Sequence, residues 1–228
     1  MSKKRIALLM AVVMVLGVAV GSTMAWLTDK TGDVTNTFTV GDINIKLQEH
    51  KVNTDGKTIG TTDADLIPTE TQNGNAYHFV PGDTLQKDPF VTVEAKSEKC
   101  YVFIKVSETN NIELTKDNTT EKAIKYDIAD GWTEYPANSG YYYQIVDQSD
   151  KTTDSNPMYI LKDNKVTVSS FIEKSHVELM GEGKNQKPVL TFTAAAVQYD
   201  NLVADNESAE ARLAAAWENL PAEFKPTP

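Results

Sequence analysis

The stretch Cys100-Tyr-Val-Phe-Ile-Lys-Val106 carries the pattern that decides the fold class. Its valine and isoleucine side chains, from Val102 to Val106, fall on one face of an extended chain, because successive side chains of a strand point to opposite faces. The aromatic side chains of Tyr101 and Phe103 fall on the other face. Apolar residues on both faces are typical of a strand that lies inside a β-sandwich or a barrel.

Segments on both sides of this stretch predict more strands. They share period-two alternation or a high content of β-branched and aromatic residues. These segments are Phe38–Leu47, Tyr77–Val80, Phe90–Glu94, Tyr141–Val146, Met158–Leu161, Val166–Val168 and Val189–Tyr199. Gly41-Asp42 interrupts the first of them and predicts a bulge or a sharp bend. Pro81-Gly82-Asp83 predicts a tight turn, since proline presets φ and glycine supplies a positive φ at the next position.

Helical patterns are rarer. Residues 208–220 predict a C-terminal helix, with Asn206 as the candidate N-cap and Pro221 as the stop. The apolar residues of this helix follow the spacing of a single face: Leu213, Ala216, Trp217 and Leu220. A short polar helix is also expected within Ile112–Ile128.

Many strands separated by turn signals, with one terminal helix, predict an all-β protein built as a β-sandwich. Periodicity does not distinguish a jelly roll from an immunoglobulin-like arrangement. We assign residues 26–228 to this single domain and expect inserts at about 51–75 and 107–185, the first of them a long loop or irregular segment. Residues 1–25 are a separate segment, an N-terminal signal peptide helix.

The first 25 residues have the order of a secretory signal peptide. A basic cluster at 3–5 precedes an uncharged apolar run, Ile6–Val20. The positive end stays cytoplasmic while the apolar run enters the membrane, so the precursor contacts the membrane transiently during export. Small residues at Thr23 and Ala25 place the peptidase cut between Ala25 and Trp26. A retained anchor is the alternative, because the apolar run counted through Leu27 is long enough to span a bilayer.

The composition excludes several classes of protein. Apolar residues make up 40% of the chain and charged residues 24%, which excludes wholesale disorder. The net charge of −10 argues against a nucleic-acid partner, because phosphate recognition needs a basic face. Residues 26–228 carry 19 of the 22 Lys and Arg residues and all 32 Asp and Glu residues, a net charge of −13. Such a charge keeps an exported protein soluble.

The sequence contains no visible catalytic, cofactor-binding or metal site. The three histidines, at positions 50, 78 and 176, are far apart, and none has a zinc-binding spacing. The nucleophile elbow, the P-loop and the dinucleotide-binding glycine motif are absent from the sequence. Cys100 has no second cysteine to pair with and is expected to be an inert buried thiol. We therefore expect a protein that is not an enzyme and binds no cofactor.

Four landmarks together resemble one family. In chain order they are Ala25-Trp-Leu-Thr-Asp29 with Asn36-Thr-Phe-Thr-Val-Gly41 before the first strand, the Pro81-Gly82-Asp83 turn, the strand end Ala196-Val-Gln-Tyr199, and Ala216-Trp217 at the end of the helix. They are similar to the TasA/camelysin-like group of exported Gram-positive proteins, whose precursors are cut by a dedicated signal peptidase of the SipW type. Residues 51–75 and 107–185 match nothing in that group.

The resemblance implies a jelly-roll domain, cleavage after Ala25 and a role in extracellular fibres of the biofilm matrix. It also implies that the freed segment, about Trp26–Val40, adds as a strand to the next subunit. Asp29–Asn36 is polar, so Phe38 and Val40 are the candidate anchors of that strand. Some camelysin relatives are described as metalloproteases, but the missing zinc motif argues against that activity here.

The leading hypothesis is a secreted structural protein of the cell surface or matrix that self-associates into filaments after processing by the dedicated signal peptidase. A monomeric cell-surface adhesin or ligand-binding β-sandwich is the alternative, motivated by the long inserts, because function often lies on variable loops. A secreted metallopeptidase is the third hypothesis.

Overall fold

The computed structural model describes residues 42–67, 74–180 and 187–226. Strands dominate this part of the chain and helices are few, which confirms the all-β class. The chain from Asp42 onward forms one compact unit. The signal peptide at residues 1–25, the cut between Ala25 and Trp26, and the anchors Phe38 and Val40 lie outside the described residues.

The first sheet joins strands that are distant in the sequence. Its order is β2-β1-β4-β11, continued by β3-β12-β8. The strands are β1 (Ile45–His50), β2 (Leu66–Ile67), β3 (Thr84–Gln86), β4 (Phe90–Val93), β8 (Ile124–Lys125), β11 (Met158–Tyr159) and β12 (Lys165–Val168). Backbone bonds from Ile160 N to Pro89 O and from Lys87 N to Asn164 O, both 2.8 Å, link the two groups of strands. β3 and β4 therefore act as one interrupted strand beside β11 and β12.

The second sheet has β5 near its centre. Its order is β13-β5-β10-β9, with β5 at Cys100–Thr109, β9 at Thr133–Glu134, β10 at Tyr141–Val146 and β13 at Val189–Gln198. β13 pairs antiparallel with all ten residues of β5. A separate hairpin, β6 (Glu113–Lys116) and β7 (Thr119–Lys122), follows β5 along the chain. Two 3₁₀ turns, Asp63–Asp65 and Lys162–Asn164, and a short helix α2 (Lys174–Met180) complete the loops.

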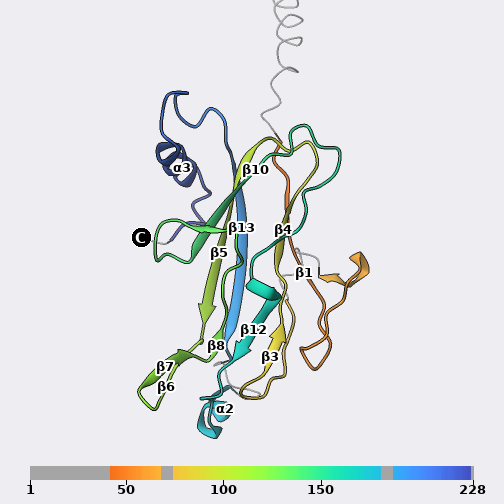
Figure 1. Ribbon diagram of the computed structural model, residues 1–228, viewed down its shortest axis with the longest axis vertical. Helices are drawn as coiled ribbons and strands as arrows, with labels where there is room; N and C mark the ends of the chain where they lie inside the picture. The colour runs from red at the N-terminus through yellow and green to blue at the C-terminus, as the bar shows by residue number, and fades with distance from the viewer. Residues whose placement is uncertain (1–41, 68–73, 181–186, 227–228) are drawn as a thin grey trace, which may run out of the picture. The chain divides into compact units, whose positions relative to one another are not determined.

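The two sheets share one apolar core. Val102 and Ile104 of β5 and Val91 and Val93 of β4 are all fully buried in the same cluster. Figure 1 shows β4, β1, β3 and β12 on one side and β5, β10 and β13 on the other. The even-numbered face of β5 therefore packs between the sheets, as the alternation in the sequence predicts.

The outer face of the second sheet is covered by helix α3 (Ala209–Glu218) and the chain after it. Tyr101 and Phe103 of β5 lie in this second apolar cluster. The indole of Trp217 packs edge-on against Tyr141, with ring centroids 5.1 Å apart. Apolar residues on both faces of β5 are thus explained by a sheet that is buried on both sides.

The N-cap of α3 is Ser208, and the prediction of Asn206 was wrong. The Ser208 hydroxyl accepts a hydrogen bond from the N–H of Ala211 at 3.1 Å. Serine and asparagine cap equally well, so propensity does not choose between neighbouring candidates. The helix itself lies within the predicted range of 208–220.

The polar helix expected within Ile112–Ile128 is wrong, because this segment forms the β6–β7 hairpin and β8. Asp117 and Asn118 both adopt positive φ, 50° and 63°, as a two-residue hairpin turn requires. The range 107–185, expected as an insert, contains three of the predicted strands. They form β10 in the second sheet and β11 and β12 in the first.

The turn at Pro81-Gly82-Asp83 is confirmed. Gly82 has a φ of +88°, and the N–H of Asp83 donates to the carbonyl of Val80 at 3.0 Å. The strand expected at Tyr77–Val80 is not part of a sheet among the described residues.

Candidate functional site

The second sheet ends in an open strand edge, because β13 pairs with β5 on one side only. The bond from Tyr199 N to Lys99 O, at 2.8 Å, shows that odd-numbered positions direct their main-chain groups toward β5. The even-numbered residues from Leu190 to Ala196 therefore turn their N–H and C=O groups away from the sheet. Within the described ranges, no backbone group pairs with this edge.

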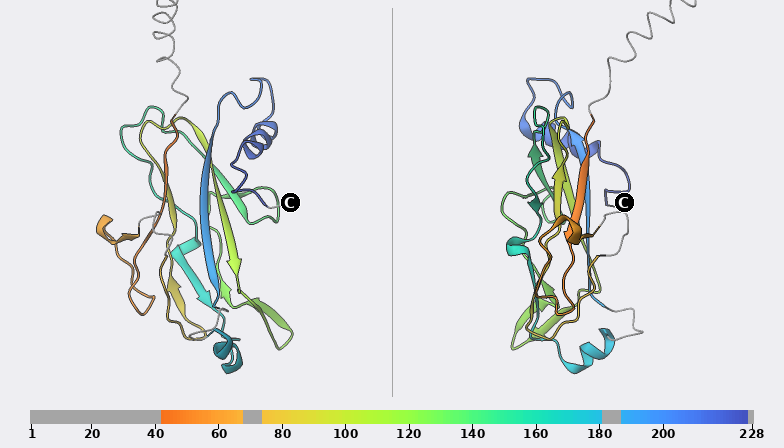
Figure 2. Two further views of the ribbon diagram at one scale, coloured as in Figure 1. Left: turned by 180° about the vertical axis from the view of Figure 1, so that it is seen from behind. Right: turned by 90° about the vertical axis from the view of Figure 1, so that its right-hand side faces the viewer.

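The first sheet also has an open strand edge, at β1. The bond from Glu94 N to Asn44 O, at 2.8 Å, shows that even-numbered positions pair with β4. The odd-numbered positions face the other way, where β2 covers only the last two residues of β1. The main-chain groups of Ile45 and Leu47 are therefore left on the open edge. β1 and β13 contact one another and lie side by side in the right-hand view of Figure 2.

The opposite side of the sandwich is closed by the chain that crosses from β8 to β9. An isolated bridge pairs Ile128 with Leu161 on this crossing. The buried Trp132 then donates from its indole N–H to the carbonyl of Tyr159 at 2.8 Å. The sandwich is thus closed on one side and left with two strand edges on the other.

A groove of about 680 Å³ runs between the two open edges. Its apolar lining comes from Ile45 and Leu47 of β1 and from Phe192 and Ala194 of β13. All four side chains are half-buried and pack against the core between the sheets. The groove therefore offers apolar side-chain pockets directly beside unpaired main-chain groups.

One end of this cavity is polar. The ammonium of Lys87 lies 3.0 Å from Oε2 and 3.1 Å from Oε1 of Glu49, and both side chains are largely buried. Asn75 donates to Oε1 of Glu49 at 2.7 Å, and the hydroxyl of Tyr77 lies 3.2 Å from the same oxygen. The Lys87 ammonium also lies 5.2 Å from the ring centroid of Phe192 on β13. We call Glu49, Lys87 and Asn75 the polar junction.

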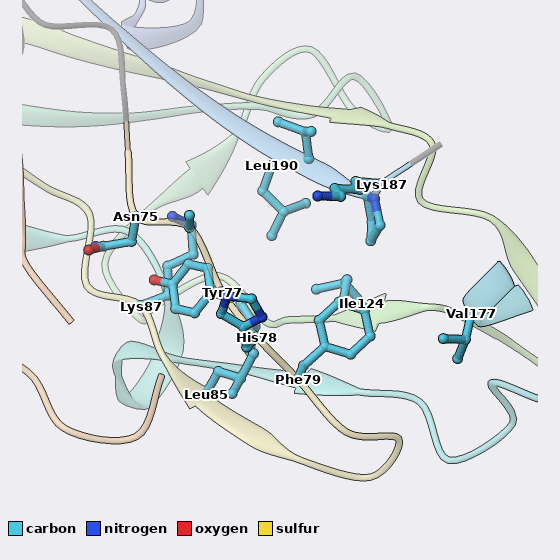
Figure 3. A pocket seen from close by; sticks show the side chains of 14 residues that line it. Asn75, Tyr77, His78, Phe79, Leu85, Lys87, Ile124, Val177, Lys187 and Leu190 are labelled. Atoms are coloured by element: carbon cyan, nitrogen blue, oxygen red, sulfur yellow. The ribbon is translucent and has the colours of Figure 1, made fainter. Parts of the chain in front are cut away.

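A second cavity of about 500 Å³ lies on the other side of the polar junction. Leu190 of β13 lies across this cavity from Tyr77 and Phe79 (Figure 3). Leu85 and Ile124 add apolar surface from the first sheet. The residues that line both cavities are Asn75, Lys87, Val189 and Leu190. The two cavities are therefore halves of one channel along β13, which we call the β1–β13 groove.

The segment Asn75–Phe79 forms the wall opposite β13 in the second half. Its burial alternates, with Asn75, Tyr77 and Phe79 half-buried and Ala76 and His78 exposed. No main-chain hydrogen bond of residues 75–79 occurs within the described chain. The segment is extended like a strand but has no strand partner there.

Burial perturbs two titratable groups at this end of β1. It raises the pKa of the Tyr77 phenol well above the ordinary value, with a further contribution from the charge of Glu49. Burial also raises the pKa of the Asp88 carboxyl, although a hydrogen bond with the His50 ring at 2.7 Å opposes the shift. Both groups lie inside hydrogen-bonded contacts with the protein and are not free in an open cleft.

The sequence did not predict the groove. The site residues predicted from the sequence are the cleavage site, Ala25 and Trp26, and the strand anchors, Phe38 and Val40. All four lie outside the described part of the chain. The apolar alternation of β1 and β13 was visible, but nothing in it reveals which strand lies at an edge. The ion pair between Glu49 and Lys87 is equally hidden, because 38 positions separate the two residues.

The histidines remain apart. His50 pairs with Asp88, His78 lines the second cavity, and His176 accepts a hydrogen bond from the N–H of Glu173. The described residues contain no cluster of three or more His, Cys, Asp or Glu that could hold a metal ion. Cys100 is fully buried, and burial raises its thiol pKa to about 12.

No helix among the described residues has the length and apolar character needed to cross a bilayer. Comparison of the chain with family models, with curated proteins and with solved structures found no match.

Proposed function

We propose that this protein is a secreted structural component of the extracellular matrix whose copies assemble into fibres. The freed N-terminal segment of one copy, about Trp26–Val40, adds as a strand to the β1–β13 groove of the next copy. The added strand completes a jelly-roll-like sandwich. The proposal extends the resemblance to the TasA/camelysin-like group.

The single observation that carries the proposal is the pair of open edges around an apolar groove. Ile45 and Leu47 on β1 and Leu190, Phe192 and Ala194 on β13 have outward main-chain groups and inward side chains. An incoming strand gains main-chain hydrogen bonds from such edges and side-chain pockets from such a groove. Exposed edges without protection are a hazard in a protein that stays monomeric.

The chain before the described domain is long enough to reach another copy. The described domain begins at Asp42, so 41 residues precede it. Of these, the 16 residues from Trp26 to Gly41 span about 53 Å when fully extended. Donor segment and acceptor groove are different surfaces, so the contact between copies is head-to-tail. A head-to-tail contact that does not close into a ring propagates as a filament.

Removal of the signal peptide would act as the trigger for assembly. Before cleavage, the apolar run Ile6–Val20 holds the segment at the membrane. After cleavage at Ala25, the new N-terminus at Trp26 is free to reach a neighbour. Assembly is thereby restricted to exported protein.

The test compares the processed chain, residues 26–228, with a chain that begins at Asp42. Both are incubated at equal concentration and examined by sedimentation and by negative-stain electron microscopy. We expect fibres from the chain that begins at Trp26 and monomers from the shorter chain. Monomers of both chains under all conditions would refute fibre assembly, and fibres of both would refute the role of the N-terminal segment.

A further inference from the structure

The polar junction lies inside a groove that is otherwise apolar. The Glu49 carboxylate receives hydrogen bonds from Lys87 and Asn75. The Lys87 ammonium has three N–H groups, and Glu49 supplies its only hydrogen-bond acceptors within the described chain. At least one of its N–H groups therefore has no acceptor there. A strand that fills the groove would bury this donor, which is costly unless the strand brings an acceptor.

The N-terminal segment carries a matching pattern. Residues 34–40 read Val-Thr-Asn-Thr-Phe-Thr-Val, so alternate positions fall on opposite faces of an extended chain. One face presents Val34, Asn36, Phe38 and Val40. This face is apolar except for Asn36, which has a valine two positions before it and a phenylalanine two positions after it.

The other face of the same segment consists of Thr35, Thr37 and Thr39. β13 presents the exposed threonines Thr191 and Thr193 on its outward side, between the inward apolar residues. Threonines that face one another across two strands form a favourable cross-strand pair. Both faces of the segment thus complement the edge of β13.

We infer that the polar junction sets the register of the incoming strand by accommodating Asn36, an inference that rests on the proposed function. The Asn36 amide oxygen accepts the spare N–H of Lys87, while Val34 and Phe38 occupy the two apolar halves of the groove. A slip of one residue would turn threonines into the groove, and a slip of two would set an apolar side chain against the ammonium. A single buried polar group can specify register in this way in other assemblies.

A double-mutant cycle tests the contact. Asn36→Leu should lower the assembly equilibrium constant about tenfold, because it buries the spare N–H of Lys87 without an acceptor. In a Glu49→Leu/Lys87→Met background, which has no charge at the junction, the same substitution should have no effect or favour assembly. Thr37→Val is the matched control on the opposite face and should behave alike in both backgrounds. An equal loss from Asn36→Leu in both backgrounds overturns the inference.

A cross-linking experiment keeps the inference testable if the Glu49→Leu/Lys87→Met protein fails to fold. A chain with Thr37→Cys is mixed with a chain that carries either Thr191→Cys or Thr193→Cys, and disulfide formation is measured. Cys100 does not interfere, because its thiol is buried. The disulfide yield should be clearly higher at one of the two acceptor positions. Asn36→Leu in the donor chain should make the two yields nearly equal. Equal yields without that change overturn the inference, whereas the absence of any fibre refutes the proposed function itself.

Discussion

The ammonium nitrogen of Lys87 lies 3.0 Å from Oε2 of Glu49 where the two apolar halves of the β1–β13 groove meet. Lys87 comes from the break between β3 and β4, and Glu49 from the end of β1. The side chains retain only 9% and 13% of their exposure. The pair therefore links the edge strand β1 to the interior of the first sheet.

Lys87→Met is expected to destabilise the fold by about 3–5 kcal/mol, because it leaves the Glu49 carboxylate buried without its cation. Glu49→Leu combined with Lys87→Met should cost much less, since an apolar pair of similar volume avoids the desolvation penalty. Urea denaturation of the two variants and the wild-type protein measures the difference. Equal losses of stability in both variants would contradict this interpretation of the pair.

Trp217→Ala is expected to destabilise the protein by about 3 kcal/mol, because the indole packs against Phe103, Tyr135 and Tyr141 beneath α3. Ser208→Ala removes the N-cap of the same helix and should cost about 1 kcal/mol. Thermal denaturation of both variants measures which substitution causes the larger loss of stability. A smaller loss from Trp217→Ala than from Ser208→Ala would show that α3 does not cover the sheet as described.

The carboxyl of Asp83 should make stability depend on pH. Hydrogen bonds from Lys57 at 2.9 Å and from the N–H of Val80 at 2.8 Å lower the pKa of Asp83 below its ordinary value. A carboxyl with a lower pKa in the folded state stabilises the fold above its unfolded pKa. That stability is lost as the pH falls through the folded pKa.

The stability difference between wild type and Asp83→Asn should therefore be largest near neutral pH and shrink as the pH falls below about 4. Denaturation midpoints across this range measure the effect. Asp205→Asn, an exposed aspartate outside this turn, serves as the control and should follow the wild type. A difference that stays constant with pH would refute the contribution of the Asp83 contacts.

Proline substitutions at two neighbouring positions of β13 distinguish the open edge of this strand from the side that pairs with β5. Ala194→Pro removes an N–H that faces the open edge, so the sheet should keep its stability while fibre assembly is blocked. Ala195→Pro removes an N–H that pairs with β5 and should destabilise the fold by about 2 kcal/mol or more. Denaturation followed by circular dichroism measures the stability of each variant, and electron microscopy shows whether it forms fibres. A destabilised Ala194→Pro protein would show that this N–H is already bonded.

The strands could be predicted where the sequence alternates over many residues. β5 and β13 are ten residues long, whereas the six residues of β10 were predicted from their aromatic and β-branched content. Short strands such as β2, β8 and β9, each of two residues, were missed because two positions carry no measurable period. They exist because neighbouring strands pair with them.

The groove depends on relations that a single sequence does not contain. Whether a strand has one neighbour or two is decided by topology, so the open edges of β1 and β13 could not be foreseen. The polar junction joins Glu49, Asn75 and Lys87 from three separate segments. The donor segment, in contrast, was visible from the resemblance, although only Phe38 and Val40 were chosen from it.

The most direct test of the account mixes two variants that cannot assemble alone. One begins at Asp42 and has the groove but no donor segment. The other carries Ala194→Pro and has the donor segment but a blocked groove. Light scattering after size-exclusion chromatography should show two monomers before mixing and a 1:1 heterodimer afterwards, without longer species. Fibres from either variant alone, or no complex after mixing, would contradict strand addition to the β1–β13 groove.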